Sequence, residues 1–305
     1  MNTPQHYRAF LVSAAWTLVL LLLGSVVHAT GSSLACPDWP TCYGSMVPAM
    51  EGGVFWEHLH RLVAGGLILM WLLAGWFVRQ EGAPAPVRRG WAVGLALLIV
   101  QAVFGGVTVL LQLPAGVSTT HLALAFIFLG LTVRLAVLSS PHPADAPPEV
   151  ARALRRWASP MAILVFAQSL LGALVRHLEA GMACPDVPLC LGQVVPPLGE
   201  PLVVVHFLHR VLAVATGVAV IVAALAVTRA GARGPVRSLA VWAGVLVVAQ
   251  IALGFASVMG RLAVVPVSLH SLVAALLFAA WVALAAMGRV SAERGAARPQ
   301  PASVA

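Results

Sequence analysis

The chain has 305 residues, of which 60% are hydrophobic and only 9% are charged. Soluble domains carry about 25% charged residues, so a chain this apolar lacks the polar surface that a soluble protein needs, and the composition indicates a membrane protein. The formal net charge of +8 does not indicate a nucleic-acid partner, because the arginines are scattered at the ends of apolar segments and do not form a basic face.

Eight apolar segments are long enough to cross a bilayer, which takes about 20 residues of helix. In chain order they are 9–29, 55–78, 90–111, 117–138, 157–177, 202–228, 236–258 and 265–288. The first segment is not read as a secretory signal peptide, because no clear small-residue cleavage site follows it. The sequence therefore predicts an all-α membrane protein with eight transmembrane helices.

The arginines predict the orientation of these helices. With the N-terminus inside, fourteen of the eighteen arginines fall on the inner side: Arg8, Arg79, Arg88, Arg89, Arg134, Arg152, Arg155, Arg156, Arg229, Arg233, Arg237, Arg289, Arg294 and Arg298. By the positive-inside rule, we expect a multi-pass protein of the cytoplasmic (inner) membrane. Both termini would lie in the cytoplasm and the cysteine-containing loops outside.

The chain is a tandem repeat. The motif CPDWPTCYG at 36–44 returns as CPDVPLCLG at 184–192, and EHLHR at 57–61 returns as HFLHR at 206–210, offset by 148 and 149 residues. Because each copy holds four helices, an even number, both copies keep the same orientation. We expect two tandem four-helix bundles related by a pseudo-two-fold axis along the membrane normal.

The repeat also sets the expected domain boundaries. An N-terminal half (1–138) is followed by a proline-rich cytoplasmic linker (139–150), a C-terminal half (151–290) and a polar cytoplasmic tail (291–305) that we expect to be disordered.

Four histidines recur in the repeat: His60 and His121 in the first half, and His209 and His270 in the second. Each falls about one turn inside a predicted helix, so all four lie at a similar depth. Ionisable residues inside a membrane are costly and are functional candidates by default. Two imidazoles at one level on two helices can take both axial positions of a heme iron.

Other interpretations of these histidines are weaker. A single buried histidine more often bonds a neighbouring helix, but the fourfold repetition favours heme ligation. A di-metal site would need clustered carboxylates, and Glu57 is essentially the one carboxylate within the predicted spans. The remaining histidines at helix ends or in loops are expected to be solvated or interfacial: His6, His28, His142 and His177.

The repeat breaks at one chemically important position. Glu57 in the first half corresponds to His206 in the second. A buried carboxylate beside one heme can handle protons, which favours one reactive heme and one helper. His58 has no equivalent histidine and lies on a different helix face from His60.

The four cysteines lie in the two predicted outer loops. The outer side is oxidising, and the motif is repeated whole, so we expect the disulfides Cys36–Cys42 and Cys184–Cys190 rather than cross-pairing. Each disulfide could staple a lid above a heme pocket. We favour this structural role for the second pair, and for the first pair a redox-active role stays open.

Further repeated polar residues have open roles. Arg61 and Arg210 follow the ligand histidines and could pair with heme propionates or extend to lipid headgroups. Gln101 and Gln250 are expected to bond between helices, with a cofactor role as the alternative. Gly105, Gly106 and Gly254 indicate close helix packing.

Taken together, these motifs resemble those of the heme A synthase family over residues 8–288: EHLHR, HFLHR, His121, His270 and both cysteine loops. The resemblance implies a heme b cofactor between His209 and His270 and the substrate heme O between His60 and His121. It implies oxidation of the C8 methyl group of heme O to a formyl group by successive hydroxylation, with Glu57 taking part.

The resemblance further implies delivery of heme O by a heme O synthase and an electron donor that the sequence does not identify. Self-association is left open. The alternative functions are a diheme membrane cytochrome that transfers electrons from quinol, and a heme exporter or carrier.

Overall fold

The computed structural model describes residues 3–142 and 146–297. In this part of the chain there are eight α-helices, joined by loops and one short 3₁₀ helix at Ala180–Met182. The helices are α1 (Gln5–Ala29), α2 (Gly52–Gln80), α3 (Ala85–Leu110), α4 (Ala115–Leu138), α5 (Pro148–His177), α6 (Pro201–Arg229), α7 (Gly234–Met259) and α8 (Val264–Ala297). All eight are long and apolar enough to cross a membrane, which confirms the predicted fold class.

The helices are longer than the predicted spans at several ends. Helices α3, α5, α6 and α7 each have a proline in the first turn. Proline is tolerated there because the N–H groups of the first turn form no hydrogen bond within the helix. Helix α5 therefore starts at Pro148 rather than near 157, and the added part, about two and a half turns, contains the buried residues Val150 and Leu154. Helix α8 continues through Ala297, beyond the expected end of the second half at 290. The rest of the expected tail (298–305) and part of the linker (143–145) lie outside the described residues.

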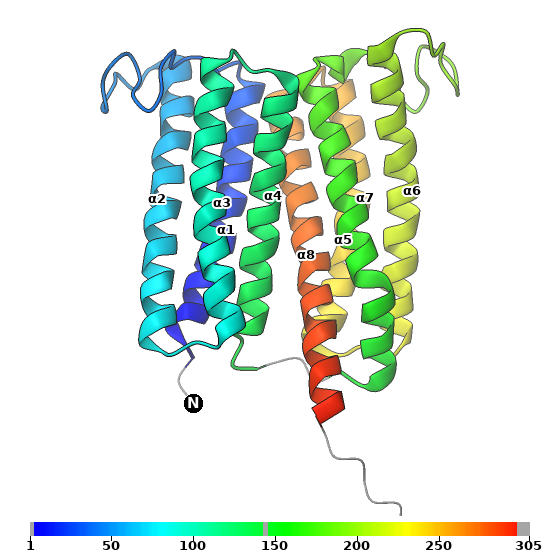
Figure 1. The fold of residues 1–305 in the computed structure, drawn as a ribbon. Coiled ribbons are helices and arrows are strands. Elements are labelled where there is room, and N and C mark those ends of the chain that lie inside the picture. Colours follow the sequence, from blue (N-terminus) through cyan, green and yellow to red (C-terminus); the bar gives the residue numbers. More distant parts are fainter. Residues whose placement is uncertain (1–2, 143–145, 298–305) are drawn as a thin grey trace, which may run out of the picture.

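The eight helices form two four-helix groups, α1–α4 and α5–α8, standing side by side (Figure 1). Between the groups, α4 contacts α8, α1 contacts α8, and α4 contacts α5. Since α4 and α8 are repeat equivalents, and so are α1 and α5, this set of contacts maps onto itself when the halves are exchanged. It is compatible with the expected pseudo-two-fold axis.

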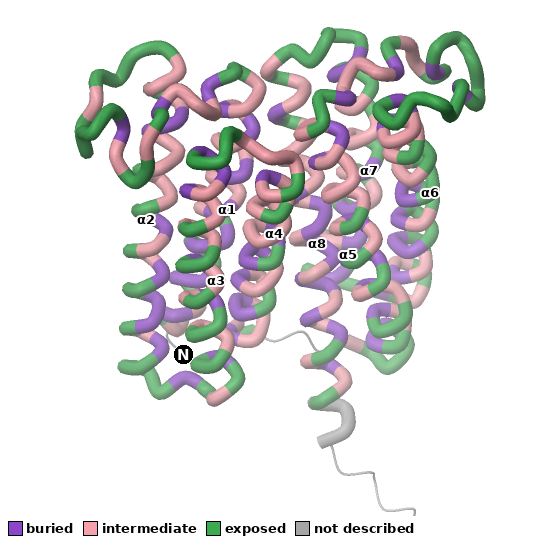
Figure 2. The backbone as a smooth tube through the Cα atoms, turned by 45° about the horizontal axis from the view of Figure 1, so that its top comes forward, coloured by how far each residue is buried: buried purple, intermediate pink, exposed green. Residues whose placement is uncertain are grey.

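The two long loops, 30–51 and 178–200, lie at the same end of the molecule and at opposite sides of it (Figure 1). We call this the loop end. In Figure 2 the outward faces of α2 and α6 are exposed, as lipid-facing surfaces are, while buried residues lie on sides that face other helices.

The densest packing lies away from the loop end. In the first half, Trp71 is fully buried against Phe10 and Phe128. In the second half, fully buried Trp281 belongs to a core shared by both halves. Trp71 and Trp281 each follow a repeated histidine by eleven residues, or about 16 Å of helix, so the histidines lie in the other part of the bundle, nearer the loops.

Candidate functional site

Each long loop is closed by a disulfide. The structure joins Cys36 to Cys42, with an S–S distance of 2.05 Å, and Cys184 to Cys190, with an S–S distance of 1.95 Å. The four cysteines are almost completely buried within their loops. The expected pairing within each loop is therefore present in the structure.

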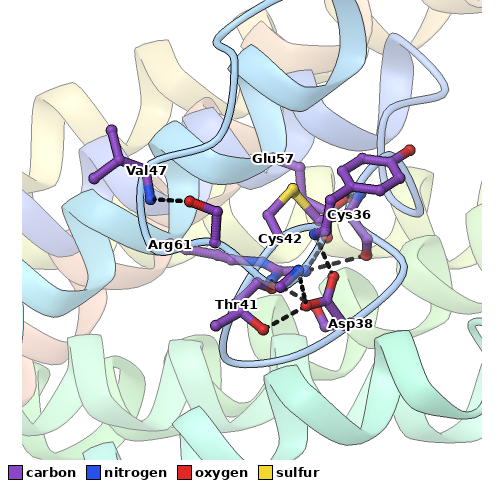
Figure 3. The surroundings of a disulfide bond; sticks show 10 residues. Cys36, Asp38, Thr41, Cys42, Val47, Glu57 and Arg61 are labelled. Carbon is purple, nitrogen blue, oxygen red and sulfur yellow. Dashed lines mark hydrogen bonds and ion pairs between the residues drawn. A yellow bond between two sulfur atoms is a disulfide. The ribbon is translucent and has the colours of Figure 1, made fainter.

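An arginine from the second helix of each half holds the loop in place. In Figure 3 the Arg61 side chain extends into the first loop, where it donates to the carbonyl oxygens of Asp38 (2.8 Å), Thr41 (2.6 Å) and Cys36 (3.3 Å). Arg210 repeats these contacts with the carbonyls of Asp186, Leu189 and Cys184 at 2.8, 2.6 and 2.6 Å. This loop-anchoring role is one that the sequence analysis missed, although the arginine and its loop repeat together.

An aspartate turns each loop just after its first cysteine. Asp38 accepts hydrogen bonds from the Tyr43 and Gly44 N–H groups, at 2.6 and 2.9 Å, and from the Thr41 hydroxyl. The hydrogen bond from Thr41, then that from Gly44, holds the pKa of the Asp38 carboxyl below its usual value. Asp186 accepts from the equivalent N–H groups in the second loop, so the backbone of both loops is built in one way.

The first loop also places an aromatic ring at its bundle. A Cβ atom added to Gly106 on α3 would lie 2.7 Å from the Trp39 ring, so the loop packs directly on this glycine. The neighbouring Gly105 backs His121. In the repeat, Trp39 corresponds to Val187 and Gly106 to Phe255. The aromatic residue of this pair of positions is therefore on the loop in the first half and on the helix in the second.

The break in the repeat lies directly beneath each loop. Buried Glu57 accepts the Cys36 N–H on Oε2 at 2.8 Å and an Arg61 N–H on Oε1 at 2.5 Å. Buried His206 instead donates its Nδ1–H to the Ala180 carbonyl at 2.9 Å and accepts the Arg210 Nε–H at 3.2 Å. The first half thus has a carboxylate where the second has a neutral imidazole with both nitrogens engaged.

Every repeated histidine packs against a glycine of the neighbouring helix. A Cβ atom would lie 3.2 Å from the His60 ring if added to Gly24 and 3.2 Å from the His121 ring if added to Gly105. In the second half the equivalent distances are 2.8 Å for Gly172 to His209 and 3.2 Å for Gly254 to His270. The residue type that leaves room for an imidazole ring therefore recurs on α1, α3, α5 and α7.

The two halves differ at the Nδ1 atoms of these histidines. His270 Nδ1 donates to the Gln250 carbonyl at 3.0 Å, and the Gln168 amide reaches His209 Nδ1 at 3.0 Å and donates to the His209 carbonyl at 2.9 Å. In the first half the Nδ1 atoms of His60 and His121 are buried and have no hydrogen-bond partner among the described residues. The residue equivalent to Gln168 in the first half is Leu20, so Gln168 is not part of the repeat and the sequence analysis missed it.

The repeated glutamines contact the other ring nitrogen of the fourth-helix histidines. Gln101 Nε2 lies 3.4 Å from His121 Nε2, and Gln250 Nε2 lies 3.2 Å from His270 Nε2. Both glutamines therefore bond between helices, as expected, and they touch the candidate ligands. Since His270 Nδ1 carries the proton, its Nε2 lone pair is the one that can bind a metal.

This donor set fits a heme held by two histidines. His60 and His121 are close enough for their charges to interact, and the same holds for His209 and His270. The glycines give the rings room, and no group of three or more His, Cys, Asp or Glu side chains in the described ranges could hold a bare metal ion.

Of the histidines expected to be solvated or interfacial, His142 is exposed and His28 and His177 are half-buried, whereas His6 departs from the expectation. His6 is buried and its Nδ1 pairs with Glu81, which also accepts the Gln5 N–H at 2.7 Å. His28 and His177 pack edge to face, with ring centroids 5.6 Å apart, and come from different halves. His58 is buried, and His142 is exposed in the linker.

Comparison with known proteins adds independent information on this arrangement. The model of the cytochrome oxidase assembly protein family COX15-CtaA matches residues 7–53 and 51–282. A heme A synthase of Symbiobacterium thermophilum is 31% identical over 272 residues, which are 86% of this chain and 88% of the relative. A heme A synthase of Halalkalibacterium halodurans is 28% identical over 272 residues, covering 86% and 89%, and one of Alkalihalophilus pseudofirmus is 29% identical over 209 residues, covering 66% and 69%.

Proposed function

Because this chain belongs to the cytochrome oxidase assembly family and is a heme A synthase, a heme-dependent membrane oxidoreductase, we propose that its two halves divide the reaction between them. The second half would hold heme b as a cofactor between His209 and His270. The first half would bind heme O as the substrate between His60 and His121, where the C8 methyl group is oxidised to a formyl group by successive hydroxylation.

The observation that carries this assignment is the difference in hydrogen bonding at Nδ1. A histidine that ligates a metal generally donates its other ring N–H to a protein acceptor, which fixes the ring and strengthens the bond to the metal. His270 has such an acceptor in the Gln250 carbonyl. At His209 the contact is of another kind, because the Gln168 NH2 group is a donor that lies 3.0 Å from Nδ1 and also donates to the His209 carbonyl. In the first half, the Nδ1 atom of His60 has no hydrogen-bond partner among the described residues, so this half suits a heme that enters and leaves.

Glu57 is the group we assign to proton handling in the first half. It lies one turn before His60 on α2, and its two oxygens are fixed by the Cys36 N–H and by Arg61. A carboxylate held in this way can keep or release a proton at a fixed position beside the substrate. His206, at the same place in the second half, has both ring nitrogens occupied.

The disulfide of the first loop supports Glu57 through the backbone. Cys36 donates its N–H to the carboxylate, and the loop that contains it is held by Arg61. We therefore assign Cys36–Cys42 the same structural role as Cys184–Cys190, which is to fix a lid above the pocket.

We propose the orientation that the arginines indicate, with both termini in the cytoplasm and the loop end outside the cytoplasmic membrane. Heme O would come from a heme O synthase, and an electron donor would be needed for each hydroxylation. Arg61 and Arg210 remain candidates for propionate binding only through N–H groups that the loop carbonyls leave free.

Coexpression with a heme O source tests the proposal. Extracted pigments should contain new heme A, and the purified protein should show a low-spin heme signal typical of two histidine ligands. Unchanged pigments with heme b alone, reduced by quinol, would instead indicate a diheme cytochrome. The absence of any tightly bound heme would indicate a carrier.

A further inference from the structure

Arg176 is a half-buried arginine that has no anionic partner among the described residues, and it lies between the two halves. Arg176, near the loop end of α5, donates to the Ser25 hydroxyl at 3.2 Å and to the Ser25 carbonyl at 2.7 Å. The side chain as a whole is half-buried, and its Nε atom is buried with no hydrogen-bond partner in the described ranges. Each of these contacts is to a neutral group, so none of them balances the charge.

The surroundings of Arg176 contain no carboxylate that pairs with it. Within residues 3–142 and 146–297, the ion pairs are those of Glu57 with Arg61 and of Glu81 with His6. Glu179, the nearest acidic residue in sequence, is exposed. The side chains that face the guanidinium are Ser25 and the imidazoles of His28 and His177.

Isolated charges are expensive to bury, and a buried charge is generally paired or bound to a ligand. Arg61 and Arg210 differ from Arg176 in this respect, because loop carbonyls take up most of their donors. Of these three arginines, Arg176 therefore has the fewest hydrogen-bond acceptors and is the one best placed to bind an anion.

The position of Arg176 relates it to the heme site of the second half. It lies four residues, one helical turn, after Gly172, the glycine that backs His209, so both are on the same face of α5. The Ser25 hydroxyl that accepts from Arg176 also contacts the hydroxyl of Ser271, the residue after His270, at 3.1 Å. The guanidinium is thus close to both candidate ligands of that half, on their loop-end side.

We propose that Arg176 binds a carboxylate of the porphyrin held in the second half, that is, a heme propionate. This inference rests on the proposed function, since it needs a heme at His209 and His270. The propionates are the anionic groups of a heme, and guanidinium forms strong, charge-assisted hydrogen bonds with carboxylates. In the repeat, His28 occupies the equivalent position of the first half, so the first half has no permanent cation there.

The test compares Arg176→Gln and Arg176→Lys with wild type in the purified holoprotein. We expect Arg176→Gln to lose heme b to excess apomyoglobin about 10- to 100-fold faster, the range that a charge-assisted hydrogen bond gives. Its heme b midpoint potential should fall, because removal of a positive charge favours the ferric state. Arg176→Lys should keep most of the potential, and Arg261→Gln, at an exposed arginine of the loop end, should change neither quantity.

Reconstitution with heme dimethyl ester separates propionate binding from a packing role. The ratio of wild-type to Arg176→Gln heme affinity should be large with ordinary heme and fall towards one with the ester. A ratio that is the same for both hemes would overturn the inference, and so would an unchanged potential in Arg176→Gln. If wild type itself shows no heme with two histidine ligands, the proposed function fails, and that result is distinct from either of these.

Discussion

The two halves of the molecule share a fold, a loop, a disulfide and a pair of histidines, yet they hold those histidines differently. In the second half the Nδ1 atoms of His209 and His270 contact Gln168 and the Gln250 carbonyl. In the first half the equivalent atom of His60 has no such contact in the described structure, whereas His121 lies near the Gln101 backbone, as His270 does near that of Gln250. Duplication thus conserved the four histidines and their glycines, while the groups that contact His60 and His209 diverged.

The same divergence is visible at the loops. At equivalent positions of the repeat, the first half has Glu57, Trp39 and His28 where the second half has His206, Val187 and Arg176. Each difference changes the charge or the size of a group near the repeated histidines. A few side-chain changes on one scaffold thus give the two halves different surroundings for equivalent histidines.

Loss of a ligand in the second half should have the largest effect. We expect His209→Ala to abolish the low-spin heme b spectrum, because the iron loses one axial ligand and Gln168 cannot replace it. Electron paramagnetic resonance of the purified protein measures this. The matched variant His60→Ala should leave the heme b signal intact, and an intact signal in His209→Ala would remove the ligand assignment.

Substitution of Glu57 should have the second-largest effect. Glu57→Gln keeps the size of the side chain and most of its hydrogen bonds but removes the proton-handling group, so heme A formation should fall about 10²- to 10⁴-fold while both hemes stay bound. Chromatography of extracted hemes measures the product. The control is His206→Gln, which should retain most activity; normal heme A output from Glu57→Gln would exclude a catalytic role.

Adding one methyl group behind each histidine should distinguish the halves more finely. Gly172→Ala places Cβ 2.8 Å from the His209 ring, whereas Gly24→Ala places it 3.2 Å from the His60 ring. Because the shorter contact forces the ring to move, Gly172→Ala should cost about 1–3 kcal/mol, the usual range for overpacking. Heme b retention after purification measures this, and equal retention in both variants would contradict the prediction.

The smallest effect is expected from making the second half resemble the first. Gln168→Leu introduces the residue found at the equivalent position, Leu20, and removes the contact with His209. Loss of such a supporting contact weakens metal binding about 10- to 100-fold, and we expect the lower end because His270 keeps its own anchor. The converse variant, Leu20→Gln, should slow heme release from the first half.

The sequence predicted the spans, the repeat and the cysteine pairing because each depends on a local pattern: apolar length, exact recurrence, or two cysteines six residues apart. Which histidines bind heme stays a prediction, and it rests on the recurrence of His60 and His121 as His209 and His270. The anchoring of the loops by Arg61 and Arg210 was missed because it requires knowing how the loop folds back over α2 and α6.

Gln168 and Arg176 were missed for a different reason. Neither has a like residue at the equivalent position, so a search for repeats passes over both. Their roles depend on contacts between helices far apart in the chain, such as Arg176 with Ser25 across 151 residues. Departures from the repeat are informative only after the structure shows what surrounds them.

The division of labour between the halves is tested most directly by identifying the hemes bound to single-half variants. Purified His121→Ala and His270→Ala, each coexpressed with a heme O source, would be extracted and their hemes identified by mass. The account predicts that His121→Ala retains heme b and loses heme O and heme A, whereas His270→Ala loses heme b. The same heme complement in both variants would contradict separate cofactor and substrate halves.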